Sequence, residues 1–110
     1  MNTSYFAKYR NGAGGVSIAL YPPRGFAGKR YKALAPPDWL LKRYKQAPDE
    51  EQYTRDYKTH VLDKLDPKQV FKDLGPDAVL LCFEAPDKFC HRRLVARWLE
   101  KHLSIIVDEL

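Results

Sequence analysis

The longest uninterrupted apolar run of the chain, AVLLCF at residues 78–83, constrains the fold more than any other feature. A run without polar alternation is typical of a strand covered on both faces, as in a parallel or mixed sheet flanked by helices. It is far shorter than the roughly 20 residues that a membrane-spanning helix needs. The run therefore predicts a buried strand inside an α/β domain and no membrane span.

The next strongest pattern lies directly downstream of this run. Residues 91–103 place Leu94, Val95, Trp98 and Leu99 on one stripe with charged side chains outside it, which predicts an amphipathic helix. The apolar segment 104–107 then predicts a closing strand. Together these segments form a strand-helix-strand unit, for which we expect a right-handed crossover.

Shorter patterns complete the predicted architecture. They indicate strands at 3–8 and 16–20, separated by the turn-forming cluster 11–15, and helices over 38–44, 49–65 and 66–74 that begin at Asp38, Asp49 and Asp66. A chain of 110 residues has room for one core. We therefore expect a single domain, 1–110, with a small three-layer, Rossmann-like α/β fold and a mostly parallel sheet flanked by helices.

The segment 21–37 holds four of the eight prolines and several basic residues. Long loops inside compact domains are uncommon unless they serve a site, so we interpret it as a rim or lid over a ligand. The alternative is a merely exposed basic loop.

Charge and cysteine content limit the classes of partner and compartment. The net charge of +5 favours anionic partners, although acidic residues are interspersed among the basic ones. The first ten residues do not resemble a signal peptide, so a cytoplasmic location is expected. Cys82 and Cys90 make no disulfide framework, and a reducing compartment predicts that both are free thiols.

The candidate site is segment 84–92, between the best strand and the best helix. Ligands of open α/β sheets lie beyond the carboxyl ends of the strands, facing helix amino termini. The unpaired amides of the first helical turn attract phosphate or carboxylate groups. Arg92 and Arg93 are expected to add full positive charges that bind such oxygens in a bidentate manner.

Three side chains of this segment have chemistry of their own. Cys90 stands where a helix dipole lowers a thiol pKa, so it is either a nucleophile or a small structural residue. His91 is a candidate general acid or base, phosphate ligand or structural residue. Glu84 is placed to accept a proton, orient His91 or bind a ribose hydroxyl, or else to pair with Arg92.

Several other classes of site are disfavoured. A zinc site built from Cys82, Cys90 and His91 needs a fourth ligand or an open water position, and neighbouring Cys90 and His91 lack the spacing of known zinc knuckles. We therefore expect no metal and no cofactor. The sequence also lacks a deaminase signature, a Walker loop and a dinucleotide-binding glycine turn.

Aromatic residues are numerous enough for one or two to stack on a ring in the cleft, the others being core. The candidates are Tyr5, Tyr9, Trp39, Tyr53 and Tyr57.

Four short blocks carry a family resemblance: TSYFA at 3–7, LLCFE at 80–84, CHR at 90–92 and ARWL at 96–99. With these blocks the chain resembles the family of domain of unknown function 488, over nearly its whole length. The resemblance implies a small single-domain bacterial or phage protein with an α/β fold and a largely unassigned role. Its signature positions are Cys82, Glu84, Cys90, His91, Arg92 and, more loosely, Tyr5.

The leading functional hypothesis is a domain that binds a small anionic, nucleotide-like ligand for sensing or sequestration. Its expected contacts are Tyr5, Glu84, Cys90, His91, Arg92 and Arg93. The alternative is a nucleotide-processing enzyme with Cys90, or Glu84 and His91, as catalytic groups. A third hypothesis is a nucleic-acid-binding protein, for which the net charge predicts strongly salt-dependent affinity.

Overall fold

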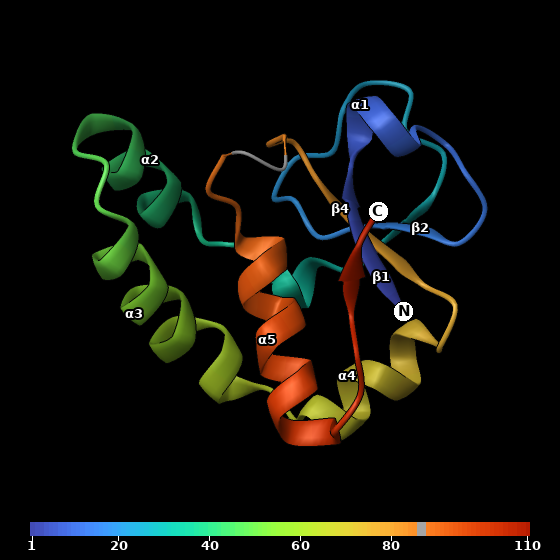
Figure 1. The fold of residues 1–110 in the computed structure, drawn as a ribbon. Helices are drawn as coiled ribbons and strands as arrows, with labels where there is room; N and C mark the ends of the chain where they lie inside the picture. Colours follow the sequence, from blue (N-terminus) through green and yellow to red (C-terminus); the bar gives the residue numbers. More distant parts are fainter. Residues whose placement is uncertain (86–87) are drawn as a thin grey trace.

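The computed structural model describes residues 1–85 and 88–110, which form an α/β fold around a parallel sheet (Figure 1). The strands are β1 (Asn2–Tyr5), β2 (Gly15–Ser17), β3 (Lys29–Arg30), β4 (Val79–Cys82) and β5 (Asp108–Glu109). Their order across the sheet is β3-β2-β4-β1-β5, and every pairing between neighbours is parallel. The predicted fold class is therefore confirmed.

In the part of the chain that the structure describes, five α-helices and two short 3-10 turns surround the sheet. The helices are α1 (Phe6–Tyr9), α2 (Asp38–Gln46), α3 (Glu50–His60), α4 (Pro67–Leu74) and α5 (His91–Leu103), and the 3-10 turns are η1 (Lys32–Leu34) and η2 (Leu62–Lys64). Helix α5 contacts β1 and β4, while α2 and α3 pair with each other on its far side (Figure 1). None of the described helices is long and apolar enough to cross a bilayer.

Strand β4 is the centre of the sheet and is buried at all of its positions. Its side chains alternate between two apolar clusters, with Leu80 in the larger one beneath the helices and Val79 and Leu81 in a smaller one with Phe6 and Phe26. Both faces of the strand are therefore covered, as the continuous apolar run predicts.

Two of the three predicted helix starts have the expected capping contact. The Asp49 carboxylate accepts a hydrogen bond from the Gln52 amide at 3.0 Å, and the Asp66 carboxylate accepts one from the Lys68 amide at 3.1 Å. Asp38 is different because Pro37 occupies the N-cap position and Asp38 is already helical. Its carboxylate instead pairs with Lys42, one turn later, at 2.9 Å.

Several predicted boundaries are wrong. Strand β1 ends at Tyr5 and gives way to α1, while β2 ends at Ser17, although the Ile18 amide still donates to the Leu81 carbonyl. Helix α3 stops at His60, because Val61 leaves the helical conformation. Within segment 21–37 the structure contains β3 and η1, so this segment is not wholly loop.

The closing strand also lies later than predicted. Ser104 adopts a left-handed conformation that ends α5, and the chain then turns back toward the sheet. The Val107 amide is bound by the Glu100 carboxylate at 2.9 Å instead of by a neighbouring strand. Pairing with β1 begins only at Asp108, as strand β5.

Candidate functional site

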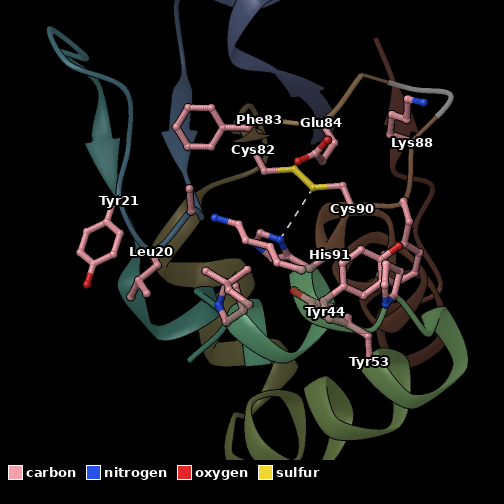
Figure 2. Close-up of a pocket in the computed structure, with 16 residues that line it drawn as sticks. Leu20, Tyr21, Tyr44, Tyr53, Cys82, Phe83, Glu84, Lys88, Cys90 and His91 are labelled. Atoms are coloured by element: carbon pink, nitrogen blue, oxygen red, sulfur yellow. Dashed lines mark hydrogen bonds between the residues drawn. A yellow bond between two sulfur atoms is a disulfide. The ribbon is translucent and has the colours of Figure 1, made fainter. Parts of the chain in front are cut away.

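A cavity of about 600 Å³ opens where β2 and β4 end and α5 begins (Figure 2). Strands β2 and β4 are parallel neighbours, with Ser17 opposite Leu81, so the segments that follow them leave the sheet at the same edge. Tyr21 comes from the first segment and Phe83 from the second. Helix α2, the turn that follows it and helix α3 supply the opposite wall with Leu41, Tyr44, Lys45, Pro48 and Tyr53.

The two cysteines form a disulfide at this cavity, so the expectation of free thiols is wrong for this structure. Cys82 ends β4 and Cys90 precedes α5, and the two side chains meet at the cavity (Figure 2). Their Cα atoms are 7.3 Å apart. Both residues line the cavity, although Cys82 is only 2% exposed and Cys90 8%.

His91 is buried and its two ring nitrogens have different partners. Nε2 lies 2.8 Å from the Ile18 carbonyl oxygen, which only accepts hydrogen bonds, so Nε2 carries the proton and donates. Nδ1 faces the Cys90 Sγ at 3.7 Å (Figure 2). Burial lowers the His91 pKa to about 4, with the Arg92 charge adding to the effect and the Ile18 hydrogen bond opposing it. The imidazole is therefore neutral at pH 7.

Arg92 is turned away from the cavity and is 1% exposed. Its Nη2 pairs with a Glu109 carboxylate oxygen at 2.8 Å, and its Nη1 donates to the Glu84 carbonyl at 2.6 Å. The same Nη1 lies 3.0 Å from the Cys82 sulfur. The guanidinium therefore joins the start of α5 to β5 and to the end of β4, and its donors are engaged within the protein.

Arg93 and Tyr5 also lie outside the part of the cavity lining that the described residues form. The Arg93 Nη1 donates to the Thr3 hydroxyl at 2.8 Å and to the Val107 carbonyl at 3.0 Å. The Tyr5 ring centre lies 5.8 Å from the Arg92 guanidinium carbon. Of the predicted contact residues, the structure thus brings Glu84, Cys90 and His91 together at the cavity and places Tyr5, Arg92 and Arg93 behind it.

The cavity also contains residues that the sequence analysis did not select. Lys45 and Lys88 supply its positive charge, and both side chains are exposed. Phe89 stacks on Tyr44, with ring centres 5.5 Å apart, and meets Tyr53 edge-on at 5.1 Å. Of the predicted stacking candidates, Tyr53 alone belongs to the described lining. Its neighbour Tyr57 is buried and donates its hydroxyl to the Leu34 carbonyl.

Segment 21–37, which the sequence analysis interprets as a rim, contributes to the described cavity lining only near its two ends, through Tyr21 and Pro36. Lys29, from the middle of segment 21–37, belongs to the opposite end of the sheet, where its ammonium donates to the Asp73 carbonyl at 2.6 Å. The basic residues of this segment are therefore not gathered at the cavity.

Comparison with known proteins gives one match. The family model DUF488-N3a, described as "Active DUF488-N3 subclade", matches residues 6–103, which include every described lining residue of the cavity. No curated protein and no solved structure matches the chain significantly. The match covers most of the chain and includes the LLCFE and CHR blocks. The chain therefore belongs to the DUF488 family.

Proposed function

We propose that this protein binds a small anionic, nucleotide-like ligand in the cavity beyond β2 and β4. The observation that carries the proposal is the combination, in one cavity of about 600 Å³, of aromatic rings, two lysines and a carboxylate. A cavity of this size is in the range that holds small molecules and cofactors. A cytoplasmic protein of this kind would act by sensing or sequestering its ligand.

Aromatic side chains would hold the ring of the ligand. Tyr44 and Phe89 already stack on each other at the cavity wall, and Tyr21 and Phe83 stand exposed at its mouth, at 69% and 52%. Exposed aromatic faces of this kind stack readily on a planar base. They therefore favour a ligand with an aromatic ring over a simple anion.

Positive charge for the anionic group would come from Lys45 and Lys88, which line the same cavity. Helix α5 begins beside them, and among the described residues no side chain caps its first turn. Unpaired amides at a helix amino terminus add to the attraction for phosphate. The Glu84 carboxylate, also in the lining, would accept hydrogen bonds from sugar hydroxyls.

In this arrangement Cys90 and His91 contact the ligand from the base of the cavity, while Arg92, Arg93 and Tyr5 act indirectly. Arg92 fixes the carbonyl of Glu84 and the position of β5, and Arg93 ties α5 to Thr3. Arg92 and Arg93 are positioning residues, since their polar groups contact the protein itself, and the Tyr5 ring lies beside the Arg92 guanidinium.

The proposal is tested by native mass spectrometry of protein exposed to a nucleotide and metabolite extract. The wild type should retain a small mass, and Lys45→Ala/Lys88→Ala should lose it. The matched control is Lys42→Ala/Lys101→Ala, which removes equal charge from exposed positions outside the described cavity lining. The proposal fails if no adduct forms, or if the cavity variant retains the adduct as well as the control.

A second candidate function is a nucleotide-processing enzyme, favoured by the meeting of Glu84, Cys90 and His91 in one cavity. In the reduced protein, the unprotonated His91 Nδ1, 3.7 Å from Cys90 Sγ, would accept a hydrogen bond from that thiol and orient it. The matching family model describes its subclade as active. Cys90→Ser or Glu84→Gln would then abolish turnover of the extract under reducing conditions while leaving ligand retention largely intact.

A further inference from the structure

The strongest unexplained cluster is the group of sulfur and nitrogen atoms at the base of the cavity. The two sulfurs of Cys82 and Cys90 and a ring nitrogen of His91 all lie within 4.8 Å of one another. We propose that, when the disulfide is reduced, Cys82, Cys90 and His91 bind a divalent cation of the Zn²⁺ class. This site does not depend on the proposed nucleotide-like ligand.

His91 is oriented as metal-binding histidines are, with one ring nitrogen hydrogen-bonded to the protein and the other one available. Its Nε2–H is fixed on the Ile18 carbonyl, which leaves the Nδ1 lone pair directed toward the Cys90 sulfur. The Sγ to Nδ1 distance is 3.7 Å. Sulfur and nitrogen ligands on one tetrahedral zinc ion, with bonds of about 2.3 and 2.0 Å, stand about 3.5 Å apart. The histidine therefore needs little rearrangement.

The backbone separation of the cysteines also suits a shared cation. Their Cα atoms lie 7.3 Å apart, beyond the range of about 4.4–6.8 Å that is usual for disulfides. Two thiolates on one tetrahedral zinc place their sulfurs about 3.8 Å apart, which allows a wider backbone separation. The spacing along the chain differs from a zinc knuckle because Cys82 comes from the end of β4 and the other two residues from the start of α5.

Charge balance at this buried position favours the same assignment. Two thiolates and a divalent cation sum to zero, and the adjacent Arg92 and Glu109 neutralise each other. Arg92 Nη1, 3.0 Å from the Cys82 sulfur, donates toward it and stabilises its thiolate form. A neutral assembly avoids the cost of an uncompensated charge in the protein interior.

The fourth coordination position would open toward the cavity. Within residues 1–85 and 88–110, only these three side chains form a group of metal-ligating atoms. Three protein ligands with an exchangeable fourth position are the arrangement of catalytic rather than structural zinc sites. Water, or an anionic group entering the cavity, would fill that position.

Formation of the site is a balanced two-step process. A dithiol reductant passes two electrons and two protons to the Cys82–Cys90 bond, which becomes two thiols while the reductant becomes a disulfide. The cation then displaces both thiol protons to solvent and accepts the two thiolates and the His91 nitrogen. Oxidation of the pair by a disulfide or a peroxide would reverse the process and release the cation.

The test uses Co²⁺ and Zn²⁺ with the whole protein, reduced by a non-thiol phosphine. Reduced wild type should bind one cation per chain and show a thiolate-to-cobalt charge-transfer band with tetrahedral d–d absorption. Protein oxidised with diamide, and Cys82→Ser/Cys90→Ser, should lack the band. His102→Ala, which removes an exposed histidine from the same helix, should retain it.

Two results would overturn the proposal. One is the absence of the band from reduced wild-type protein, a measurement that does not depend on whether any variant folds. The other is equal zinc affinity of wild type and Cys82→Ser/Cys90→Ser, which would place the cation on surface groups. Neither result concerns ligand retention by Lys45 and Lys88, so the metal site and the proposed function fail separately.

Discussion

The first turn of α5 has two sides that differ in what their side chains contact. Cys90 and His91 line the cavity, whereas Arg92 and Arg93, the next two residues, bind groups on β1, on β5, at the end of β4 and in the segment between α5 and β5. Successive residues of an α-helix are rotated by about 100° from each other, so neighbours in sequence diverge in direction. The positively charged side chains of the cavity consequently come from α2, with Lys45, and from the segment before α5, with Lys88. The two arginines stabilise the fold instead.

The largest effect is expected from Arg92→Ala, which removes the buried guanidinium. It removes the ion pair of the Glu109 carboxylate and the hydrogen bond to the Glu84 carbonyl, so the free energy of unfolding should fall by about 3 kcal/mol. The matched control Arg97→Ala, at an exposed position of α5, should change it by less than about 0.5 kcal/mol. Urea denaturation measures both, and equal stabilities would contradict the assignment of Arg92 to the fold.

Glu109→Gln tests the ion pair between Arg92 and Glu109 by removing the negative charge. Burial raises the pKa of Glu109, but hydrogen bonds from Arg92 and Thr3 and the charges of Arg92 and Arg93 outweigh it and hold the pKa below its usual value of 4.5. A carboxyl whose folded pKa is lowered stabilises the protein above its unfolded pKa, and that stability is lost as the pH falls toward the folded pKa.

The wild type should therefore exceed Glu109→Gln in unfolding free energy by about 2 kcal/mol at pH 7, and the difference should shrink as the pH falls below 4.5. Thermal melts at a series of pH values check this. A difference that is independent of pH would show that the negative charge of Glu109 does not stabilise the fold.

On the cavity side, Lys45→Ala/Lys88→Ala should leave stability within about 0.5 kcal/mol of the wild type, because both side chains are exposed. Its affinity for a nucleoside monophosphate should fall about tenfold, through the loss of charge-assisted contacts. Isothermal titration calorimetry at constant salt gives the affinity. A loss of stability without a loss of affinity would reverse the roles assigned to the lysines and to Arg92.

The smallest effect is expected from Arg93→Ala. This side chain is only half-buried, so water can replace its contacts to the Thr3 hydroxyl and the Val107 carbonyl. We expect a loss of about 1 kcal/mol in the free energy of unfolding and unchanged affinity for a nucleoside monophosphate. Parallel urea melts and calorimetry measure both quantities, and a loss equal to that of Arg92→Ala would erase the distinction between the two arginines.

The core elements were predictable because their patterns are local. The apolar run 78–83 and the periodicity of 91–103 correspond to β4 and α5. The burial of Arg92 could also have been predicted from the sequence. Arg92 stands three, four and seven positions before Val95, Ala96 and Leu99, and this spacing places it on the buried face of the helix. The short edge strands β3 and β5 have no local sequence pattern of this kind, because only their pairing with a neighbouring strand defines them.

The candidate site was predictable only in part, for a similar reason. Glu84, Cys90 and His91 follow from the rule that ligands lie beyond the carboxyl ends of parallel strands. Lys45 and Tyr44 reach the cavity because α2 packs against α3, which in turn contacts α5, and that placement depends on tertiary contacts. The approach of Cys90 to Cys82 likewise depends on the path of the chain after β4.

The most direct test of the account is a titration of ¹⁵N-labelled protein with a mixture of the common ribonucleoside monophosphates, followed by amide chemical shifts. Binding in the cavity should shift the signals of Leu20, Tyr44, Phe89 and His91 and leave those of Arg93 and Glu109 unchanged. Shifts centred on Arg93 and Glu109, or no shifts at the four cavity residues, would contradict the claim that this cavity is the ligand site.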